Sequence, residues 1–141
     1  MSLSPKIVVA EPSTVVATGT GTEIARRGVS FDGNSVVLVA SACTACDAVA
    51  WPPAARCHAC WAAVTPRRLA TSGTLYAFTT VHTAAPDTEV PYVIGYVDLS
   101  DGVRVFSPLR GDASRLRIDG PVNLHGAAGA PGAGFWFEAA R

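Results

Sequence analysis

Four cysteines stand in two pairs of the form Cys-x-x-Cys, and the chain has no other cysteine. The first pair is Cys43 and Cys46, and the second, ten residues later, is Cys57 and Cys60. Two such pairs can supply the four thiolates of a tetrahedral structural zinc site, in which each Zn–S bond is about 2.3 Å. The spacing therefore predicts one ion held by all four cysteines. Zinc is preferred, and iron in a rubredoxin-like site is also compatible with four sulfur ligands.

Two other uses of the cysteines agree less well with the sequence. Two disulfides would require an oxidising compartment and an export signal, but the first apolar run, residues 7–10, is too short for a signal-peptide core. A thioredoxin-like redox centre needs one Cys-x-x-Cys pair near a βαβ pattern, whereas here two pairs occur in tandem. No segment approaches the length of a membrane span. We therefore expect a cytoplasmic protein with a structural metal ion.

A site with four cysteine ligands is closed, so zinc here is not expected to act as a Lewis acid. His58 lies inside the second pair and would be a surplus ligand, so we expect it to be exposed. Asp47 and Trp61 directly follow the two pairs, where glycine often relaxes the turn. Because Trp tolerates the left-handed backbone region less well than Asp, we expect the second turn to be less regular.

Composition limits the classes of function. The chain has 141 residues, with 11 basic and 11 acidic residues, and only one basic residue, Lys6, is a lysine. A general nucleic-acid-binding protein would show a strong basic excess, which is absent here. With 49% hydrophobic residues the chain is globular, and its 13 Gly and 10 Pro indicate short strands and turns.

The segments after the cysteines are typical of β-strands. Strand-like runs lie at 73–83, 120–126 and 134–140, and the run 90–109 reads as two strands joined by a hairpin turn at Asp101-Gly102. We expect their aromatic residues to be mainly core, namely Tyr92, Tyr96, Phe106, Phe135 and Trp136. Five strands behind a metal ribbon predict a small closed barrel of the OB-fold type. The predicted protein is mainly β, with an extended N-terminal arm (1–35), a rubredoxin-like zinc ribbon (36–68) and a five-stranded OB-fold (69–141).

A set of motifs in fixed order makes the prediction more specific. After the cysteine pairs come "FTTVH", "PYVIGYVDLSDGVRV", "LRIDGPV" and "FWFE". Over residues 36–141 this order resembles the zinc-ribbon/OB-fold proteins filed as domain of unknown function thirty-five, which are associated with acyl-CoA and thiolase-like enzymes. One difference is that Asp47 stands where the family has glycine after the first pair.

The resemblance implies an accessory subunit in a hetero-oligomer. Its partner would be a thiolase, acyltransferase or thiolase-fold aldolase that carries the nucleophile, and the ligand of the complex would be a CoA thioester. The residues agree that the chain has no catalytic group of its own. Its three histidines, His58, His82 and His125, lie in separate segments, and all four cysteines are assigned to the metal.

Four residues of the ribbon are candidates for contact with CoA. Guanidinium groups bind phosphate oxygens bidentately, so Arg56, Arg67 and Arg68 could meet the phosphates. Trp61 could stack on adenine or pack against a partner. The alternative is that the arginines are solvated surface residues and that the tryptophan only covers a small ribbon.

Three classes of function therefore remain. The accessory subunit of an acyl-CoA enzyme leads, because the motifs favour it. An OB-fold protein that binds single-stranded nucleic acid would need a basic groove beside stacking aromatics, and balanced charge counts against it. A rubredoxin-like electron carrier would contain iron in place of zinc and would be red when oxidised.

Overall fold

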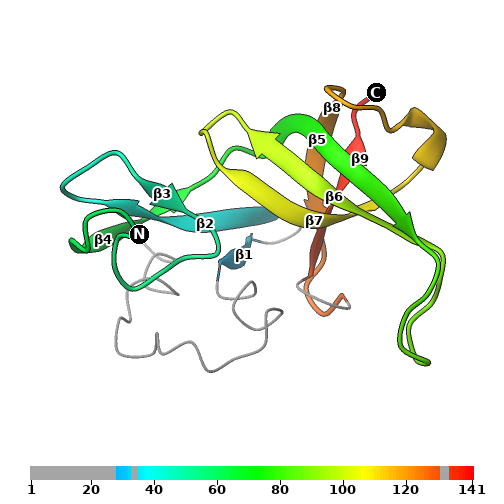
Figure 1. Cartoon of the computed structure of the whole chain (residues 1–141), viewed down its shortest axis with the longest axis horizontal. Coiled ribbons are helices and arrows are strands. Elements are labelled where there is room, and N and C mark those ends of the chain that lie inside the picture. The colour runs from blue at the N-terminus through cyan, green and yellow to red at the C-terminus, as the bar shows by residue number, and fades with distance from the viewer. Residues whose placement is uncertain (1–27, 33–34, 131–133) are drawn as a thin grey trace.

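The computed structural model describes residues 28–32, 35–130 and 134–141. Most of the predicted N-terminal arm, residues 1–27 and 33–34, lies outside this described part. The described residues of the arm include a strand, β1 (Val29–Asp32), that pairs antiparallel with the next strand. The chain is mainly β, as the sequence predicts, and its order of strands is shown in Figure 1.

The N-terminal half of the described chain is a small sheet built around one long strand. This strand is β2, and Val36, Leu38 and Ala40 at alternate positions along it belong to the hydrophobic core. Val39 and Ser41 on its opposite face are buried as well. The other strands of the sheet all pair antiparallel with β2. The bounds are β2 (Ser35–Cys43), β3 (Val49–Ala50) and β4 (Val64–Arg68). Because β2 ends at Cys43, the sheet places the first cysteine pair directly at its end.

The C-terminal half is a closed barrel of five strands in the order β5-β6-β7-β9-β8. All neighbours are antiparallel except β7 and β9, which run parallel. Their bounds are β5 (Ser72–Val81), β6 (Tyr92–Leu99), β7 (Arg104–Arg110), β8 (Pro121–Gly126) and β9 (Phe135–Ala139), with a short 3-10 helix, η3 (Ala113–Arg115), between β7 and β8. This topology is the predicted five-stranded OB-fold, and the predicted hairpin turn is present, with Gly102 at φ 83°.

The two halves share one hydrophobic core. Leu38 and Ala40 of β2 belong to the same buried cluster as Val97 and Phe137 of the barrel. Trp51, from the loop after β3, packs edge-on against Phe135 of β9 with ring centroids 5.4 Å apart. The predicted division at residue 69 therefore falls within a continuous core, because Leu69 itself is buried in this cluster. The domain limits remain a prediction, and buried residues on both sides of residue 69 pack into the same core.

The prediction that the strand aromatics are mainly core is wrong for two of them. Phe135 is buried, but 45% of Tyr96 and 52% of Phe106 is exposed. In β6 the buried positions are Gly95, Val97 and Leu99, so Tyr96 must point outward. Inward and outward residues alternate along the strand as predicted, but the smaller side chains occupy the inside of this narrow barrel.

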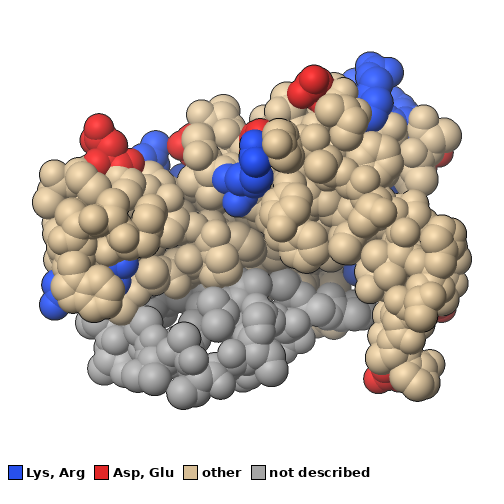
Figure 2. Space-filling model, in the orientation of Figure 1, with Lys and Arg blue, Asp and Glu red and all other residues tan. Residues whose placement is uncertain are grey.

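The connection between β5 and β6 projects beyond the barrel. Residues 82–91 are all exposed, and the projection is visible in Figure 1. Figure 2 shows acidic side chains at its far end. Most of the described surface in Figure 2 is free of Lys, Arg, Asp and Glu. In the described part of the chain, no helix is long and apolar enough to cross a membrane.

Candidate metal centre

The four cysteine sulfurs form one cluster beyond the end of β2. The Sγ atoms of Cys43 and Cys60 are 3.5 Å apart, those of Cys46 and Cys57 are 3.6 Å apart, and those of Cys46 and Cys60 are 3.8 Å apart. All four sulfurs lie within 4.8 Å of one another. A tetrahedron with Zn–S bonds of about 2.3 Å requires sulfurs about 3.8 Å apart. The cluster therefore has the size of a four-thiolate metal site.

Each cysteine pair sits on a tight turn whose backbone points N–H groups at a sulfur. The N–H groups of Ala45 and Cys46 donate to the Sγ of Cys43 at 3.2 and 3.3 Å, and that of Ala59 donates to the Sγ of Cys57 at 3.3 Å. Such bonds favour the thiolate over the thiol. The two turns repeat the same local structure, which explains why two equal Cys-x-x-Cys spacings produce one site.

The electrostatics of the cluster indicate that it needs a cation. The backbone N–H groups of Cys60 and Ala59 lower the pKa of Cys57 to about 6. The N–H of Ala48 also lowers the pKa of Cys46, but the neighbouring sulfurs of Cys43 and Cys57 outweigh it and raise that pKa to about 12. Four thiolates this close repel one another, so they can all be ionised only around a positive ion.

The sulfur distances argue against the disulfide alternative. All four cysteines are free, and the Sγ–Sγ distances given above are far longer than a disulfide bond of about 2.05 Å. His58 is exposed and does not belong to the cysteine cluster, as expected for a surplus residue. The donor set fits one closed Cys₄ centre. When bound there, the ion would cross-link the two turns.

Trp61 has an unusual backbone for a large residue. Its φ is 65°, in the left-handed region, and 74% of the residue is exposed. The N–H of Trp61 donates to the carbonyl of Cys57 at 3.0 Å and closes the second turn. Asp47, which follows the first cysteine pair, has no positive φ, so the two turns differ at this position. The left-handed residue is kept at a cost in local strain.

The structure does not gather the arginine candidates on one surface. Arg67 and Arg68 are successive residues of the regular strand β4, paired with Ala40 and Val39. Successive side chains of a strand point to opposite faces, so these two cannot hold one phosphate together. Arg56 is exposed, directly precedes Cys57 in the sequence, and forms an isolated bridge with Ala63.

Sequence reasoning missed a group of exposed aromatic residues on the barrel. Tyr96 of β6 and Phe106 of β7 are cross-strand partners with ring centroids 5.2 Å apart. Beside them, the Arg104 guanidinium lies 3.4 Å from the centroid of the Tyr76 ring. The alternating pattern of each strand shows which residues share a face of the sheet. It does not show whether that face is the inside or the outside of the barrel.

A closed cysteine ribbon packed on a five-stranded OB barrel defines a zinc-ribbon/OB-fold protein, and comparison with known families agrees. The family model described as the rubredoxin-like zinc ribbon domain of ChsH2 matches residues 37–65, and the model described as the C-terminal OB-fold domain of ChsH2 matches residues 66–127. The chain belongs to this ChsH2-type family, also called domain of unknown function thirty-five.

Two curated relatives are homologous enzyme subunits. The chain is 31% identical over 96 residues to the benzoylsuccinyl-CoA thiolase subunit BbsA of Thauera aromatica, covering 66% of this chain and 65% of that protein. It is 32% identical over 71 residues to the BbsA subunit of Geobacter metallireducens, covering 48% of this chain and 47% of the relative. The chain thus spans between about half and two thirds of the relatives that it matches.

Two solved structures share the fold. The structure titled Ltp2-ChsH2(DUF35) aldolase has a TM-score of 0.63 and 28% identity, covering 74% of this chain and 86% of that one. A protein of unknown function from the DUF35 family of Sulfolobus solfataricus has a TM-score of 0.54 and 10% identity, covering 74% and 76%. The second likeness shows the fold alone.

Proposed function

We propose that this chain is a non-catalytic accessory subunit that binds a thiolase-fold partner and helps to bind or position the partner's acyl-CoA substrate. The observation that carries the proposal is the homology of the ribbon and barrel to a thiolase subunit and to a protein in an aldolase structure. The partner would be a thiolase, an acyltransferase or an aldolase of the thiolase fold. The two proteins would form a hetero-oligomer.

The metal centre supports a role without chemistry of its own. Its four cysteines are the only cysteines of the chain, and all of them lie in one cluster with the size of a closed metal site. We propose zinc as the structural ion and Cys43, Cys46, Cys57 and Cys60 as its ligands. With its thiolates used in this way, the chain would have no cysteine nucleophile to offer, so the nucleophile is assigned to the partner. This chain would contribute binding energy that orders the substrate.

The ribbon is the proposed site of contact with CoA. Arg56, Arg67 and Arg68 are exposed, and Trp61 offers an exposed ring. Because Arg67 and Arg68 leave opposite faces of β4, only one of them would meet a given phosphate. Replacing each separately with Ala should weaken CoA-ester binding by the complex, and reduce its dependence on salt, for one residue but not for the other. If both variants bind the CoA ester as tightly as the unmodified complex does, both arginines are solvated surface residues.

The proposal places the complex in the cytoplasm, where free thiolates persist because the compartment is reducing. A rubredoxin-like electron carrier remains the alternative for the metal centre, because four sulfurs also suit iron. Elemental analysis and colour separate the two: about one zinc per colourless chain supports the accessory subunit, and a red iron protein supports the carrier. The nucleic-acid alternative is disfavoured because residues 69–103, which include the whole of barrel strands β5 and β6, contain no Lys or Arg.

Reconstitution tests the function. The chain is mixed with a candidate thiolase-fold partner, and thiolysis or acyl transfer is measured for each protein alone and for the mixture. We expect no turnover by this chain alone, a stable complex, and partner activity that depends on the complex. Turnover by the isolated chain would contradict the proposal, and so would a partner that is fully assembled and active without it.

A further inference from the structure

The outer surface of β5, β6 and β7 carries exposed aromatic and apolar side chains. We call it the aromatic face, and it consists of Tyr76, Ala77, Thr79, Ile94, Tyr96 and Phe106. The exposed fractions of Tyr76, Tyr96 and Phe106 are 49%, 45% and 52%. Burial of these rings inside this chain therefore does not explain their presence. Contiguous exposed apolar surface on a small protein marks a site of interaction.

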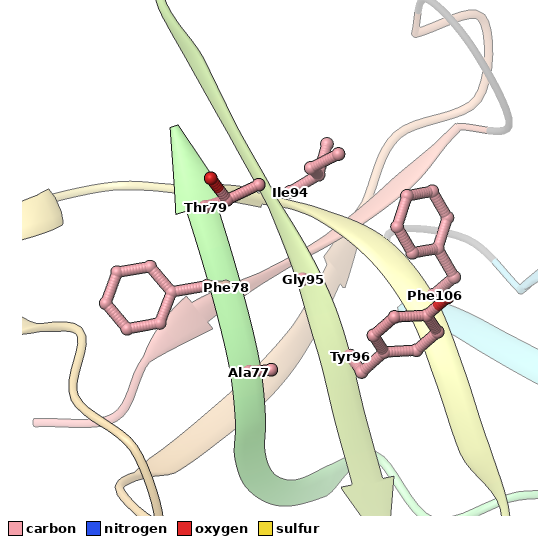
Figure 3. Close-up of a pocket in the computed structure, with 7 residues that line it drawn as sticks. All are labelled: Ala77, Phe78, Thr79, Ile94, Gly95, Tyr96 and Phe106. Carbon is pink, nitrogen blue, oxygen red and sulfur yellow. The ribbon is translucent and has the colours of Figure 1, made fainter. Parts of the chain in front are cut away.

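A shallow apolar pocket lies in the middle of the aromatic face. It measures about 170 Å³, and Figure 3 shows Tyr96 and Phe106 side by side on one side of the sheet while the ring of Phe78 points to the other. Gly95 helps to line this pocket. Sites that enclose small ligands usually measure about 300–1,000 Å³. The pocket is too small for a cofactor such as CoA, but it can take one apolar side chain of another protein.

The charges around the aromatic face indicate the kind of partner. Arg104 is already held by Asp98, whose carboxylate accepts from Nε at 2.6 Å and from a terminal guanidinium nitrogen at 3.0 Å. The adjoining projection, residues 82–91, carries Asp87 and Glu89, and it contains no Lys or Arg. A nucleic-acid backbone would meet no free cation here, although the corresponding strands of OB-folds often bind oligonucleotides. An apolar protein surface with a basic rim would fit both the rings and the acidic projection.

We propose that the aromatic face is the surface on which the partner subunit docks, with an apolar side chain of the partner in the pocket and basic residues of the partner opposite Asp87 and Glu89. The inference rests on the proposed function, since it names the surface used by that complex. It also separates the roles of the two halves: the barrel binds the partner, and the ribbon is left to contact CoA.

The experiment measures affinity for the thiolase-fold partner by calorimetry with the full-length chain. The double variant Tyr96→Ser/Phe106→Ser removes two exposed rings and should weaken binding by about tenfold or more, as expected for central aromatic residues of an interface. Ala77→Arg leaves both rings in place but fills the pocket, and it should weaken binding to a similar extent. Asp87→Lys/Glu89→Lys should also weaken binding, most strongly at low salt.

The matched control is His125→Ser, which removes a half-exposed ring from β8, a strand that pairs with neither β6 nor β7. It should bind the partner like the unmodified chain. Zinc content and circular dichroism establish that each variant is folded. Unchanged affinity of both the double variant and Ala77→Arg would overturn the docking surface while leaving the proposed function intact. The same result accompanied by loss of self-association would assign the face to a second copy of this chain. If the unmodified chain does not bind the partner, the proposed function itself is contradicted, and the docking surface with it.

Discussion

The ribbon and the barrel are similar in strand content but differ in what holds them together. In the ribbon, beyond the first half of β2, the strands are short and the side chains around the cysteine pairs are largely exposed, so little apolar surface is removed from water. In the barrel, Leu75, Val97, Val105 and Phe137 are completely buried. We therefore expect the outer ribbon to depend on a metal ion for its stability, and the barrel to depend on its buried core.

The two regions are nevertheless joined more closely than a ribbon and a barrel connected by a linker would be. Leu38 and Ala40 of the ribbon strand β2 lie in the core of the barrel, and Val36 closely approaches Gly126 of β8. Only the two cysteine turns, Cys43–Cys46 and Cys57–Cys60, are therefore expected to depend on the ion alone, because Trp51 between them packs against Phe135 of the barrel. This limit can be tested by damaging each region separately.

Removal of the metal should have the largest effect. Structural zinc contributes about 10–16 kcal/mol of apparent binding energy in small zinc domains, so chelation or Cys57→Ala should unfold the two cysteine turns. Hydrogen exchange followed by mass spectrometry should show loss of protection there and retained protection in β6 and β7. The control is His58→Ala, next to the ligand but exposed, which should keep about one zinc per chain. Equal loss of protection in the barrel would mean that the two regions fold as one unit.

Phe137→Ala should destabilise the barrel by about 3–5 kcal/mol, because it removes a fully buried ring and leaves a cavity. Phe106→Ala removes the same side chain from an exposed position and should cost well under that amount. The measurement is denaturant unfolding of the zinc-loaded protein, followed by circular dichroism. Similar losses for the two variants would show that Phe106 has a structural role that its exposure hides.

Trp61 allows a smaller and sharper test in the ribbon. Trp61→Gly and Trp61→Ala both remove the ring, but only glycine adopts a φ near 65° without strain. We expect the glycine variant to be more stable than the alanine variant by about 1 kcal/mol, measured by resistance of the zinc centre to denaturant. If alanine is equally stable, the turn has relaxed out of the left-handed region and the strain assigned to Trp61 is absent.

The ion pair of Asp98 and Arg104 should have the smallest effect. The hydrogen bond from Arg104 lowers the pKa of Asp98 from its ordinary value of 3.8, so the pair stabilises the folded state at neutral pH and this contribution is lost as the pH falls below that value. Both side chains are partly exposed, so Asp98→Asn should cost less than about 1 kcal/mol. Unfolding measured between pH 7 and pH 3 should show the two proteins converging in acid. A constant difference would exclude the ion pair as its cause.

The sequence was sufficient for the metal centre because that centre is local. Two equal spacings produce two equal turns, and one strand, β2, brings them to one end of the sheet. The five barrel strands were also predictable, since each is a short β-branched or aromatic run between turn residues, as at Asp101-Gly102.

Orientation could not be predicted in the same way. A period of two shows that Tyr96 and Asp98 share a face, but not that Gly95 and Val97 occupy the inside, which is decided by the space available when five strands close. The separation of Arg67 and Arg68 was visible in principle, because neighbours in a strand diverge, but it required knowing that β4 is regular there. The exposed ring of Trp61 also had no signal beyond its position after Cys60.

The position of β9 in the barrel has a consequence for how the protein is made. This strand, Phe135–Ala139, lies between β7 and β8 and supplies Phe137 to the core, although it is the last strand to leave the ribosome. Until it arrives, β7 and β8 each present an unpaired edge to the crowded interior of the cell, and such edges recruit other chains. The cysteine pairs emerge much earlier and can bind their ion during synthesis. We therefore expect the nascent chain to carry its metal before it has a closed barrel, and to depend most on chaperones in that interval.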